Sequence, residues 1–274
     1  MSMKIALETL GCKVNQYESS HAVEALTTAG HSMVSFKDRA DVYVVHGCAV
    51  TSRASYETRQ LLRRARRINP NAALVAMGCE AQRDPRRLAG EKLATHIIGN
   101  AHKHDLVRHL EEHADTASPF IRVSDMARRS VFQPMPVNHM LMGRTRAYVK
   151  VQDGCNAFCS YCVIPFTRGR SRSLPAGEVL DQVRRFLDHD YKEMVLTGIH
   201  LGQWGRDFSP QQELSDLLHL MDQSEKPARI RLSSLEPMEW LPSLLEAMPR
   251  WPWLCPHFHI PLPSGDDPHL QLMG

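Results

Sequence analysis

The chain has 274 residues, 43% of them hydrophobic and 23% charged, with a formal net charge of +3. This length allows two domains, and the lack of any apolar run of about 18 residues excludes a membrane-spanning helix. The first residues carry no signal segment, so we expect a cytoplasmic protein. Its seven cysteines are then expected to act as ligands or catalysts rather than in disulfides.

The amino-terminal part alternates predicted strands with predicted helices. Apolar runs and helical patterns with stop signals predict strands over residues 3–10, 41–46 and 71–77, and helices over residues 17–29 and 52–68. Strand–helix–strand order implies parallel strands joined by right-handed crossovers. We therefore expect a Rossmann-like parallel-sheet domain over residues 1–118.

Each of these strands runs directly into a glycine–cysteine pair, and the cysteines are Cys12, Cys48 and Cys79. Because the carboxyl ends of parallel strands lie at one edge of a sheet, the three cysteines should converge there. The glycines allow the tight turns that this requires. The alternative is that three small buried hydrophobic residues happen to be cysteine.

Residues 119–143 lose the periodicity and contain three prolines, so we expect a linker there. Alternation then resumes over residues 144–274. Strands are predicted over residues 146–152, 193–198, 228–234 and 257–262, and helices over residues 176–189, 211–221 and 241–248. This is the rhythm of a (β/α) barrel. Four strands do not close a barrel, so we expect a partial barrel with an exposed edge.

The loop after the first of these strands contains Cys155, Cys159 and Cys162. The Cys-x3-Cys-x2-Cys spacing suits a cubane iron–sulfur cluster, for which thiolates are the preferred ligands. Three cysteines leave one iron without a protein ligand. Zinc is the alternative, but a structural zinc site needs four ligands, usually from two knuckles. No second knuckle lies near this loop.

The segment VQDGCNAFCSYCVIPFTRGRSRS resembles the cluster loop of the radical S-adenosylmethionine (SAM) enzymes, specifically the methylthiotransferases. The resemblance continues through TLGCKVNQYES, GCEAQ, LTGIHLG, RLSSLEP and HIPLPSG. The first of these is most similar to the branch that methylthiolates threonylcarbamoyladenosine beside the tRNA anticodon. The chain departs from the family at His46 and Pro263, and family members extend further, with a completed barrel and a carboxyl-terminal RNA-binding β domain. We therefore expect a truncated chain.

This resemblance implies two [4Fe–4S] clusters and SAM as cofactors. Cys155, Cys159 and Cys162 would hold the cluster that cleaves SAM to a 5′-deoxyadenosyl radical, and Cys12, Cys48 and Cys79 would hold the second cluster. The residues expected around SAM are Tyr161, Thr197, Gly198, Ser233, Ser234 and Glu236; each has a core or loop-capping role as its alternative. Cys255 matches neither cluster, and we expect a buried structural thiol.

The resemblance also implies a tRNA anticodon loop as substrate, an electron donor such as flavodoxin or ferredoxin, and a sulfur donor. Local basic clusters suit phosphate contacts, and the arginines that we expect at RNA are Arg63, Arg67, Arg168 and Arg170. A solvated helix face is the alternative for Arg63 and Arg67. The alternatives for the whole chain are a cluster-binding but inactive fragment, a methylthiotransferase for isopentenyladenosine in tRNA or for a ribosomal-protein aspartate, and a zinc-stabilised RNA-binding module.

Overall fold

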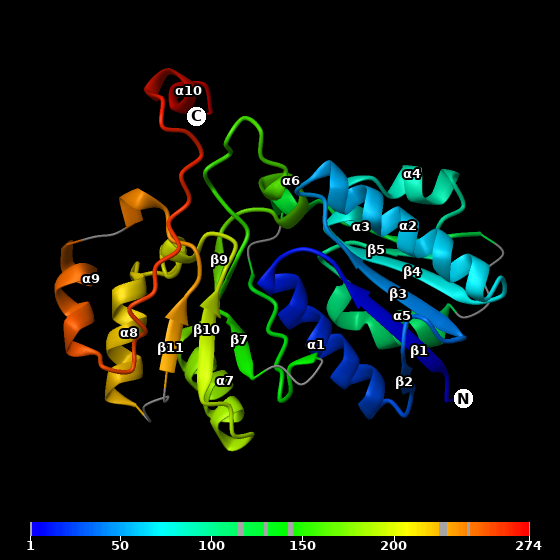
Figure 1. Cartoon of the computed structure of the whole chain (residues 1–274), viewed down its shortest axis with the longest axis horizontal. Coiled ribbons are helices and arrows are strands. Elements are labelled where there is room, and N and C mark those ends of the chain that lie inside the picture. Colours follow the sequence, from blue (N-terminus) through cyan, green and yellow to red (C-terminus); the bar gives the residue numbers. More distant parts are fainter. Residues whose placement is uncertain are drawn as a thin grey trace. The chain divides into compact units, whose positions relative to one another are not determined.

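A computed structural model of the chain describes residues 2–113, 118–128, 131–141, 145–224, 229–239 and 242–273. The chain divides into two compact units (Figure 1). Unit 1 comprises Met1–Arg129 together with Phe166–Arg168, and unit 2 comprises Ser130–Pro165 and Gly169–Gly274. Among the helices in the described ranges, none is long and apolar enough to cross a membrane.

Unit 1 contains a six-stranded sheet in the order β2-β1-β3-β4-β5-β6, and every neighbouring pair is parallel. Its strands are β1 (Lys4–Thr9), β2 (Ser32–Val34), β3 (Val42–Gly47), β4 (Ala73–Gly78), β5 (His96–Ile98) and β6 (Phe120–Arg122). The predicted strands correspond to β1, β3 and β4. The linker predicted over residues 119–143 is wrong at its start, because β6 pairs with β5.

Helices cover both faces of this sheet, with α1 and α5 on one side and α2, α3 and α4 on the other (Figure 1). They are α1 (Lys13–Thr28), α2 (Ser52–Ile68), α3 (Cys79–Arg83), α4 (Pro85–Gly90) and α5 (Leu106–Glu112). Alternate residues of β3 explain the two layers, since side chains of a strand point to opposite faces. Tyr43 and Val45 pack in the core cluster that contains Leu62 of α2, whereas Val44 packs in the cluster that contains Leu26 of α1.

Unit 2 contains a parallel three-stranded sheet in the order β11-β10-β7. Its strands are β7 (Arg146–Lys150), β10 (Glu193–Thr197) and β11 (Arg229–Leu232), and a short antiparallel pair is formed by β8 (Gln152–Asp153) and β9 (Arg172–Ser173). The helices that follow are α7 (Ala176–Asp188), α8 (Leu214–Gln223), α9 (Pro242–Ala247) and α10 (Asp267–Met273). Helix α6 (Ile164–Arg168) comes after the cysteine loop.

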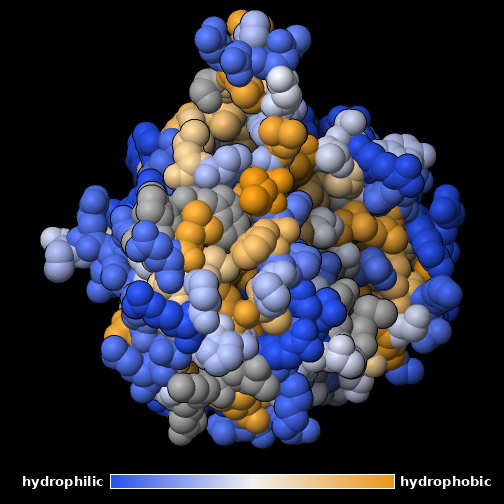
Figure 2. Space-filling view, turned by 60° about the vertical axis from the view of Figure 1, so that its left-hand side comes forward, coloured by the Kyte–Doolittle hydropathy of each residue, from blue (hydrophilic) through white to orange (hydrophobic). Residues whose placement is uncertain are grey.

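The strand predicted over residues 257–262 is wrong. Residues 257–262 belong to no strand, and only an isolated bridge between Ile230 and Leu254 extends the pairing beyond β11. Pro256 and Pro261 lack the N–H that a strand ladder needs, which explains why pairing stops. Phe258, Ile260 and Leu262 are exposed, and Figure 2 shows hydrophobic surface interspersed with hydrophilic surface on the face turned forward.

Candidate functional site

The cysteines of unit 1 all leave the sheet at the same edge. Thr9 of β1 lies opposite His46 of β3, and Gly47 lies opposite Gly78 of β4. Cys12, Cys48 and Cys79 follow within three residues of these paired positions. The approach is close, since a Cβ atom on Gly11 would lie 2.7 Å from the Cβ atom of Cys48. The structure therefore brings the three cysteines together at the carboxyl edge of parallel strands.

Gly78 is required by its backbone and by a neighbouring ring. Its φ of +90° lies in the region that favours glycine, and a Cβ atom there would lie 2.4 Å from Cδ2 of His46. His46 is fully buried, and its Nδ1 atom lies 2.8 Å from the Ser19 hydroxyl. The departure from the family pattern at His46 is thus a packed residue directly beneath the cysteine edge.

Two asparagines connect the cysteine loops. Asn100 donates from Nδ2 to the sulfur of Cys79 at 3.5 Å, and the Cys12 thiol donates to Oδ1 of Asn15 at 3.8 Å. Asn15 also donates to the carbonyl of Leu10 at 2.8 Å. The amide of Asn100 suits a thiolate ligand at Cys79, because a hydrogen bond to sulfur stabilises its anionic form.

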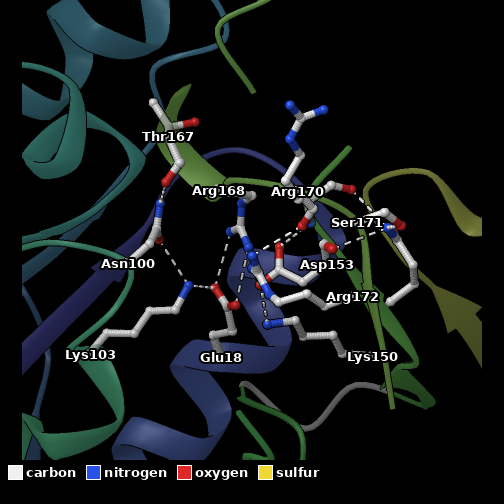
Figure 3. Close-up of polar contacts among 12 residues, drawn as sticks. Glu18, Asn100, Lys103, Lys150, Asp153, Thr167, Arg168, Arg170, Ser171 and Arg172 are labelled. Carbon is white, nitrogen blue, oxygen red and sulfur yellow. Dashed lines mark hydrogen bonds and ion pairs between the residues drawn. The ribbon is translucent and has the colours of Figure 1, made fainter. Parts of the chain in front are cut away.

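A group of buried charges lies next to these asparagines (Figure 3). Arg168 donates from Nη1 and Nη2 to the carboxylate of Glu18 at 3.2 and 3.1 Å, and Nζ of Lys103 lies 2.5 Å from the same carboxylate. Arg168 also donates to Oδ1 of Asn15 at 2.6 Å. The side chains of Glu18 and Arg168 have no exposed surface. Arg168 therefore cannot reach an RNA phosphate, and that prediction is corrected here.

Two thiols of unit 1, Cys12 and Cys48, resist ionisation when nothing compensates their charge. Burial raises the pKa of the Cys48 thiol above its ordinary value, the Val50 N–H opposes this, and negative charge on Cys79 adds to it. Cys12 keeps contact with solvent, but many protein atoms surround its sulfur. That burial raises the pKa of Cys12, against the positive charge of Arg168. Three thiolates at this edge need a cationic partner, as a bound metal provides.

In the part of the chain that the structure describes, no group of three or more His, Cys, Asp or Glu side chains is arranged around a single metal ion. A cubane cluster makes a different demand, since each thiolate binds a separate iron. Three cysteines on neighbouring loops, with an amide donor to the sulfur of Cys79, are a donor set of the right chemistry for it.

The cysteine loop of unit 2 is closed on itself by backbone contacts. Cys155 donates its N–H to the carbonyl of Gly169 at 3.0 Å, and Cys162 donates to the carbonyl of Cys159 at 2.9 Å. Gly154 allows the closure, because its φ is +75° and a Cβ atom would lie 2.0 Å from the carbonyl oxygen of Arg170. All three cysteines are half-buried.

Three polar residues at this loop were missed by the sequence analysis: Gln152, His200 and Glu239. Gln152 donates to the carbonyl of Gly154 at 2.7 Å and accepts from the N–H of His200 at 2.8 Å. Nδ1 of His200 lies 3.2 Å from the sulfur of Cys155, and its Nε2 lies 2.5 Å from Oε1 of Glu239. His200 lies in the LTGIHLG motif, which could have indicated it as a site residue from the sequence.

These contacts shift the pKa values of His200 and Cys155. Burial alone lowers the pKa of His200, but its bonds to Cys155 and Glu239 raise it to about 10. Burial alone raises the pKa of Cys155, whereas the hydrogen bonds from His200 and from the Ala157 N–H lower it overall. The site therefore favours a thiolate at Cys155.

The residues expected around SAM lie at two strand ends and on the cysteine loop. Thr197 ends β10 and is buried, and Gly198 lies against Gln152, whose Oε1 would be 2.8 Å from an added Cβ atom. Ser233 follows β11, and its buried hydroxyl has no hydrogen-bond partner among the described residues. The other three are Ser234, bonded to His259 at 2.7 Å, Glu236, whose N–H donates to Glu239 at 3.0 Å, and the exposed Tyr161.

The other arginines expected at RNA are at least partly exposed. Arg170 is exposed, and its guanidinium lies 4.3 Å from the centroid of the Phe158 ring. Arg67 on α2 is also exposed. Arg63 is half-buried and forms an ion pair with Glu91 at 2.9 Å, so the helix-face interpretation fits Arg63 well. Cys255 is buried, as expected of a structural thiol.

Comparisons with known proteins agree with the division of the chain into two units. Residues 4–99 match the family described as Uncharacterized protein family UPF0004, and residues 149–274 match the Radical SAM superfamily. In the solved structures, a radical S-adenosylmethionine methyltransferase, TsrM from Kitasatospora setae, aligns with a TM-score of 0.62 at 13% identity. The alignment covers 95% of this chain and 61% of that one. It confirms the predicted fold class.

Three relatives carry the sequence comparison. Threonylcarbamoyladenosine tRNA methylthiotransferase MtaB of Aquifex aeolicus (strain VF5) is 38% identical, over 99% of this chain and 65% of the relative. The protein of the same name from Bacillus subtilis (strain 168) is 35% identical, over 98% and 59%. The tRNA-2-methylthio-N(6)-dimethylallyladenosine synthase of Clostridium botulinum (strain Loch Maree / Type A3) is 26% identical, over 98% and 60%. The chain thus spans 59–65% of the length of these relatives.

Residues 149–274 thus match the Radical SAM superfamily, and the α/β unit before them carries a second cysteine trio at the edge of its sheet. Over nearly its whole length the chain is similar to two proteins named as tRNA methylthiotransferases.

Proposed function

We propose that this chain belongs to an enzyme that adds a methylthio group to carbon 2 of N6-threonylcarbamoyladenosine next to the tRNA anticodon. The observation that carries the proposal is the pair of cysteine trios, one at the carboxyl edge of the parallel sheet of unit 1 and one on the loop that follows β8 in unit 2. The identity of 35–38% to two proteins named as threonylcarbamoyladenosine methylthiotransferases supports this branch, against 26% for the dimethylallyladenosine relative.

Cys155, Cys159 and Cys162 hold one [4Fe–4S] cluster in this proposal, and Cys12, Cys48 and Cys79 hold the other. The first cluster supplies an electron for the cleavage of SAM when it is bound. His200 and Gln152 orient the loop, since the hydrogen bonds at Cys155 and Gly154 fix its path. In this proposal Thr197, Gly198 and Ser233 would line the place for SAM, and the buried hydroxyl of Ser233 has no hydrogen-bond partner among the described residues. Ser234, Glu236 and Tyr161 would lie next to it.

The reaction balances with sulfur at the oxidation level of sulfide. One substrate C–H bond, one sulfide and two SAM molecules give the C–S–CH3 group, 5′-deoxyadenosine, methionine and S-adenosylhomocysteine. The hydrogen of carbon 2 would leave in 5′-deoxyadenosine, and the methyl group would come from the second SAM. One electron would enter for SAM cleavage, and one would leave when the C–S bond forms. A sulfur donor and an electron donor such as flavodoxin or ferredoxin are the implied partners, in the cytoplasm.

Mass spectrometry of tRNA nucleosides, from cells with and without this gene, tests the proposal. We expect the methylthio form of threonylcarbamoyladenosine to disappear when the gene is absent and its unmodified form to accumulate. Loss of methylthio-isopentenyladenosine instead would assign the chain to the other tRNA branch. Unchanged tRNA, with a changed mass of a ribosomal protein, would assign it to the aspartate branch.

A further inference from the structure

The buried charges of unit 1 lie where they affect the amino-terminal cysteines. Glu18 accepts two hydrogen bonds from Arg168 and contacts Lys103 at 2.5 Å. Arg168 donates to Oδ1 of Asn15 at 2.6 Å, and the Cys12 thiol donates to the same oxygen at 3.8 Å. Lys103 donates to Oδ1 of Asn100 at 2.9 Å, and Nδ2 of Asn100 donates to the sulfur of Cys79 at 3.5 Å. Each cation is therefore two hydrogen bonds away from a cysteine sulfur.

The group contains charges of both signs. The cations Arg168 and Lys103 both contact the carboxylate of Glu18. The third neighbour is His46, whose Nε2 lies 3.7 Å from Oε2 of Glu18 and which is either neutral or cationic. The side chains of Glu18, Arg168 and Lys103 are 0%, 0% and 4% exposed, so solvent screens these charges little.

Burying these charged side chains costs free energy, and the nearby cysteine site explains why they are buried. Removing ions from water is unfavourable, and hydrophobic residues of similar volume often stabilise a fold better. A [4Fe–4S] core with two positive charges and three thiolate ligands carries one negative charge in total, and reduction adds another. The positive charges of Arg168 and Lys103 favour that negative charge, and the carboxylate of Glu18 opposes it.

We propose that Arg168, Glu18 and Lys103 are positioning residues that hold the Cys12 and Cys79 loops and set the reduction potential of the cluster at Cys12, Cys48 and Cys79. This inference rests on the proposed function, which assigns a cluster to these cysteines. Residues that support metal ligands orient them and tune the metal, and net charge near a cluster sets its potential.

The origin of Arg168 adds to this inference. It belongs to the motif behind the other cysteine loop, only six residues after Cys162, yet Phe166–Arg168 packs in unit 1. Asn100 also donates to the carbonyl of Thr167 at 2.8 Å, so the same asparagine binds this segment and Cys79. The segment therefore completes the support of the amino-terminal cysteines.

The test uses the full chain with Cys155→Ala, Cys159→Ala and Cys162→Ala, so that any reconstituted cluster reports on the amino-terminal cysteines alone. Each variant is added to this parent, and the midpoint potential is measured by anaerobic redox titration followed by electron paramagnetic resonance. Arg168→Gln and Lys103→Met each remove a positive charge and should lower the potential. Glu18→Gln removes the negative charge and should raise it.

Retention of iron provides a second measurement. Arg168→Gln should lose iron to a chelator about 10- to 100-fold faster than the parent, as is typical when a group supporting a metal ligand is removed. Arg168→Lys keeps the charge and loses the forked hydrogen bonds, so it should lose iron faster at a potential close to that of the parent. Arg87→Gln changes an exposed ion pair with Glu91 in the same unit and should change neither quantity.

Opposite shifts for Glu18→Gln and for the two cation variants are the expected result. A purely structural role predicts no such reversal, so shifts of the same sign, or none, overturn the inference while leaving the two-cluster proposal intact. If Arg168→Gln does not fold, Glu18→Gln and Lys103→Met still decide. A parent that binds no iron refutes the second cluster and the inference together, and this outcome is distinct from a cluster with an unshifted potential.

Discussion

Arg168 and Glu18 lie 150 residues apart in the sequence and form an ion pair with two hydrogen bonds, of 3.2 and 3.1 Å, and no exposed side-chain surface. Removing one member of such a pair leaves an uncompensated buried charge. Substitutions of Arg168 therefore act on the stability and the cysteine edge of unit 1, and an effect on tRNA binding is expected only through that unit.

The first prediction concerns iron content. Anaerobic reconstitution of the chain should give a brown protein with about eight irons per chain, four for each cluster. Cys159→Ala should hold about four, and Cys48→Ala also about four. Iron analysis with Mössbauer spectroscopy measures this. A colourless protein that retains zinc would contradict both cluster assignments and favour the zinc-stabilised module.

The second prediction separates the roles of the two cysteine trios. Cys159→Ala should abolish formation of 5′-deoxyadenosine from SAM under reducing conditions, because the loop Cys155–Cys162 is expected to hold the cluster that cleaves SAM. Cys48→Ala should still form 5′-deoxyadenosine but no methylthio product. Chromatography of the reaction measures both compounds. An unchanged yield of 5′-deoxyadenosine from Cys159→Ala would refute its role, and a folded, iron-loaded chain that forms none would favour the inactive-fragment alternative.

The third prediction concerns Gly78. Gly78→Ala places a side chain at a φ of +90° and 2.4 Å from the His46 ring. Backbone strain alone should lower the free energy of unfolding by about 1–3 kcal/mol, and overlap with the buried ring should add to this. Gly90→Ala is the matched control, because nothing lies within 4 Å of an added Cβ atom there. Urea denaturation should show destabilisation for Gly78→Ala only.

The fourth prediction concerns Arg170, the exposed arginine stacked on Phe158. Arg170→Ala should weaken tRNA binding. The slope of log affinity against log salt concentration should become shallower by about 1, as expected for the loss of one phosphate contact. Arg184→Ala is the control, since Arg184 is 50% exposed and pairs with Asp181 on α7. Binding titrations at several salt concentrations measure both. Equal losses for the two variants would show that only overall charge matters.

The fifth prediction concerns pH. His109 is buried, and its ring nitrogens have no hydrogen-bond partner among the described residues. Burial lowers the pKa of His109 below 6.5, Asp105 opposes this, and Arg108, Arg122 and His113 add to it. The unfolded chain therefore takes up the proton first, so stability is present above about pH 6.5 and falls as the pH drops toward the folded pKa.

His109→Phe keeps a ring at this position and removes its titration. The difference in free energy of unfolding between pH 7.5 and pH 5.5 should be smaller for this variant than for the parent, as measured by urea denaturation at both values. An identical difference would show that His109 does not titrate on unfolding in this range.

The long strands of unit 1 and their parallel arrangement followed from the sequence, but the short strands did not. Continuous apolar runs identified β3 and β4, and α2 was placed at its observed bounds, Ser52–Ile68. The strands β2, β5 and β6 each have three residues, which is too few to show a period of two. They form because a neighbouring strand offers a ladder, and this is a property of the sheet rather than of the segment.

The cysteines of the site could be predicted, whereas their supporting residues could not. A thiol after each strand is visible in the sequence, and parallel topology brings such residues together. Arg168 looks like a solvated charge in a basic motif, and its burial depends on Glu18, 150 residues away. Glu18 in turn lies in an ordinary helical pattern. Partnerships of this kind depend on the assembled fold and leave no local pattern.

The inclusion of Phe166–Arg168 in unit 1 has a consequence for biogenesis. When only the first 129 residues have been synthesised, the segments that form the sheet and its three cysteines are present in the nascent chain, but the carboxylate of Glu18 lacks its arginine. The Cys155–Cys162 loop, by contrast, has all its ligands within eight residues as soon as it emerges. Translation must pass residue 168 before the amino-terminal unit is whole.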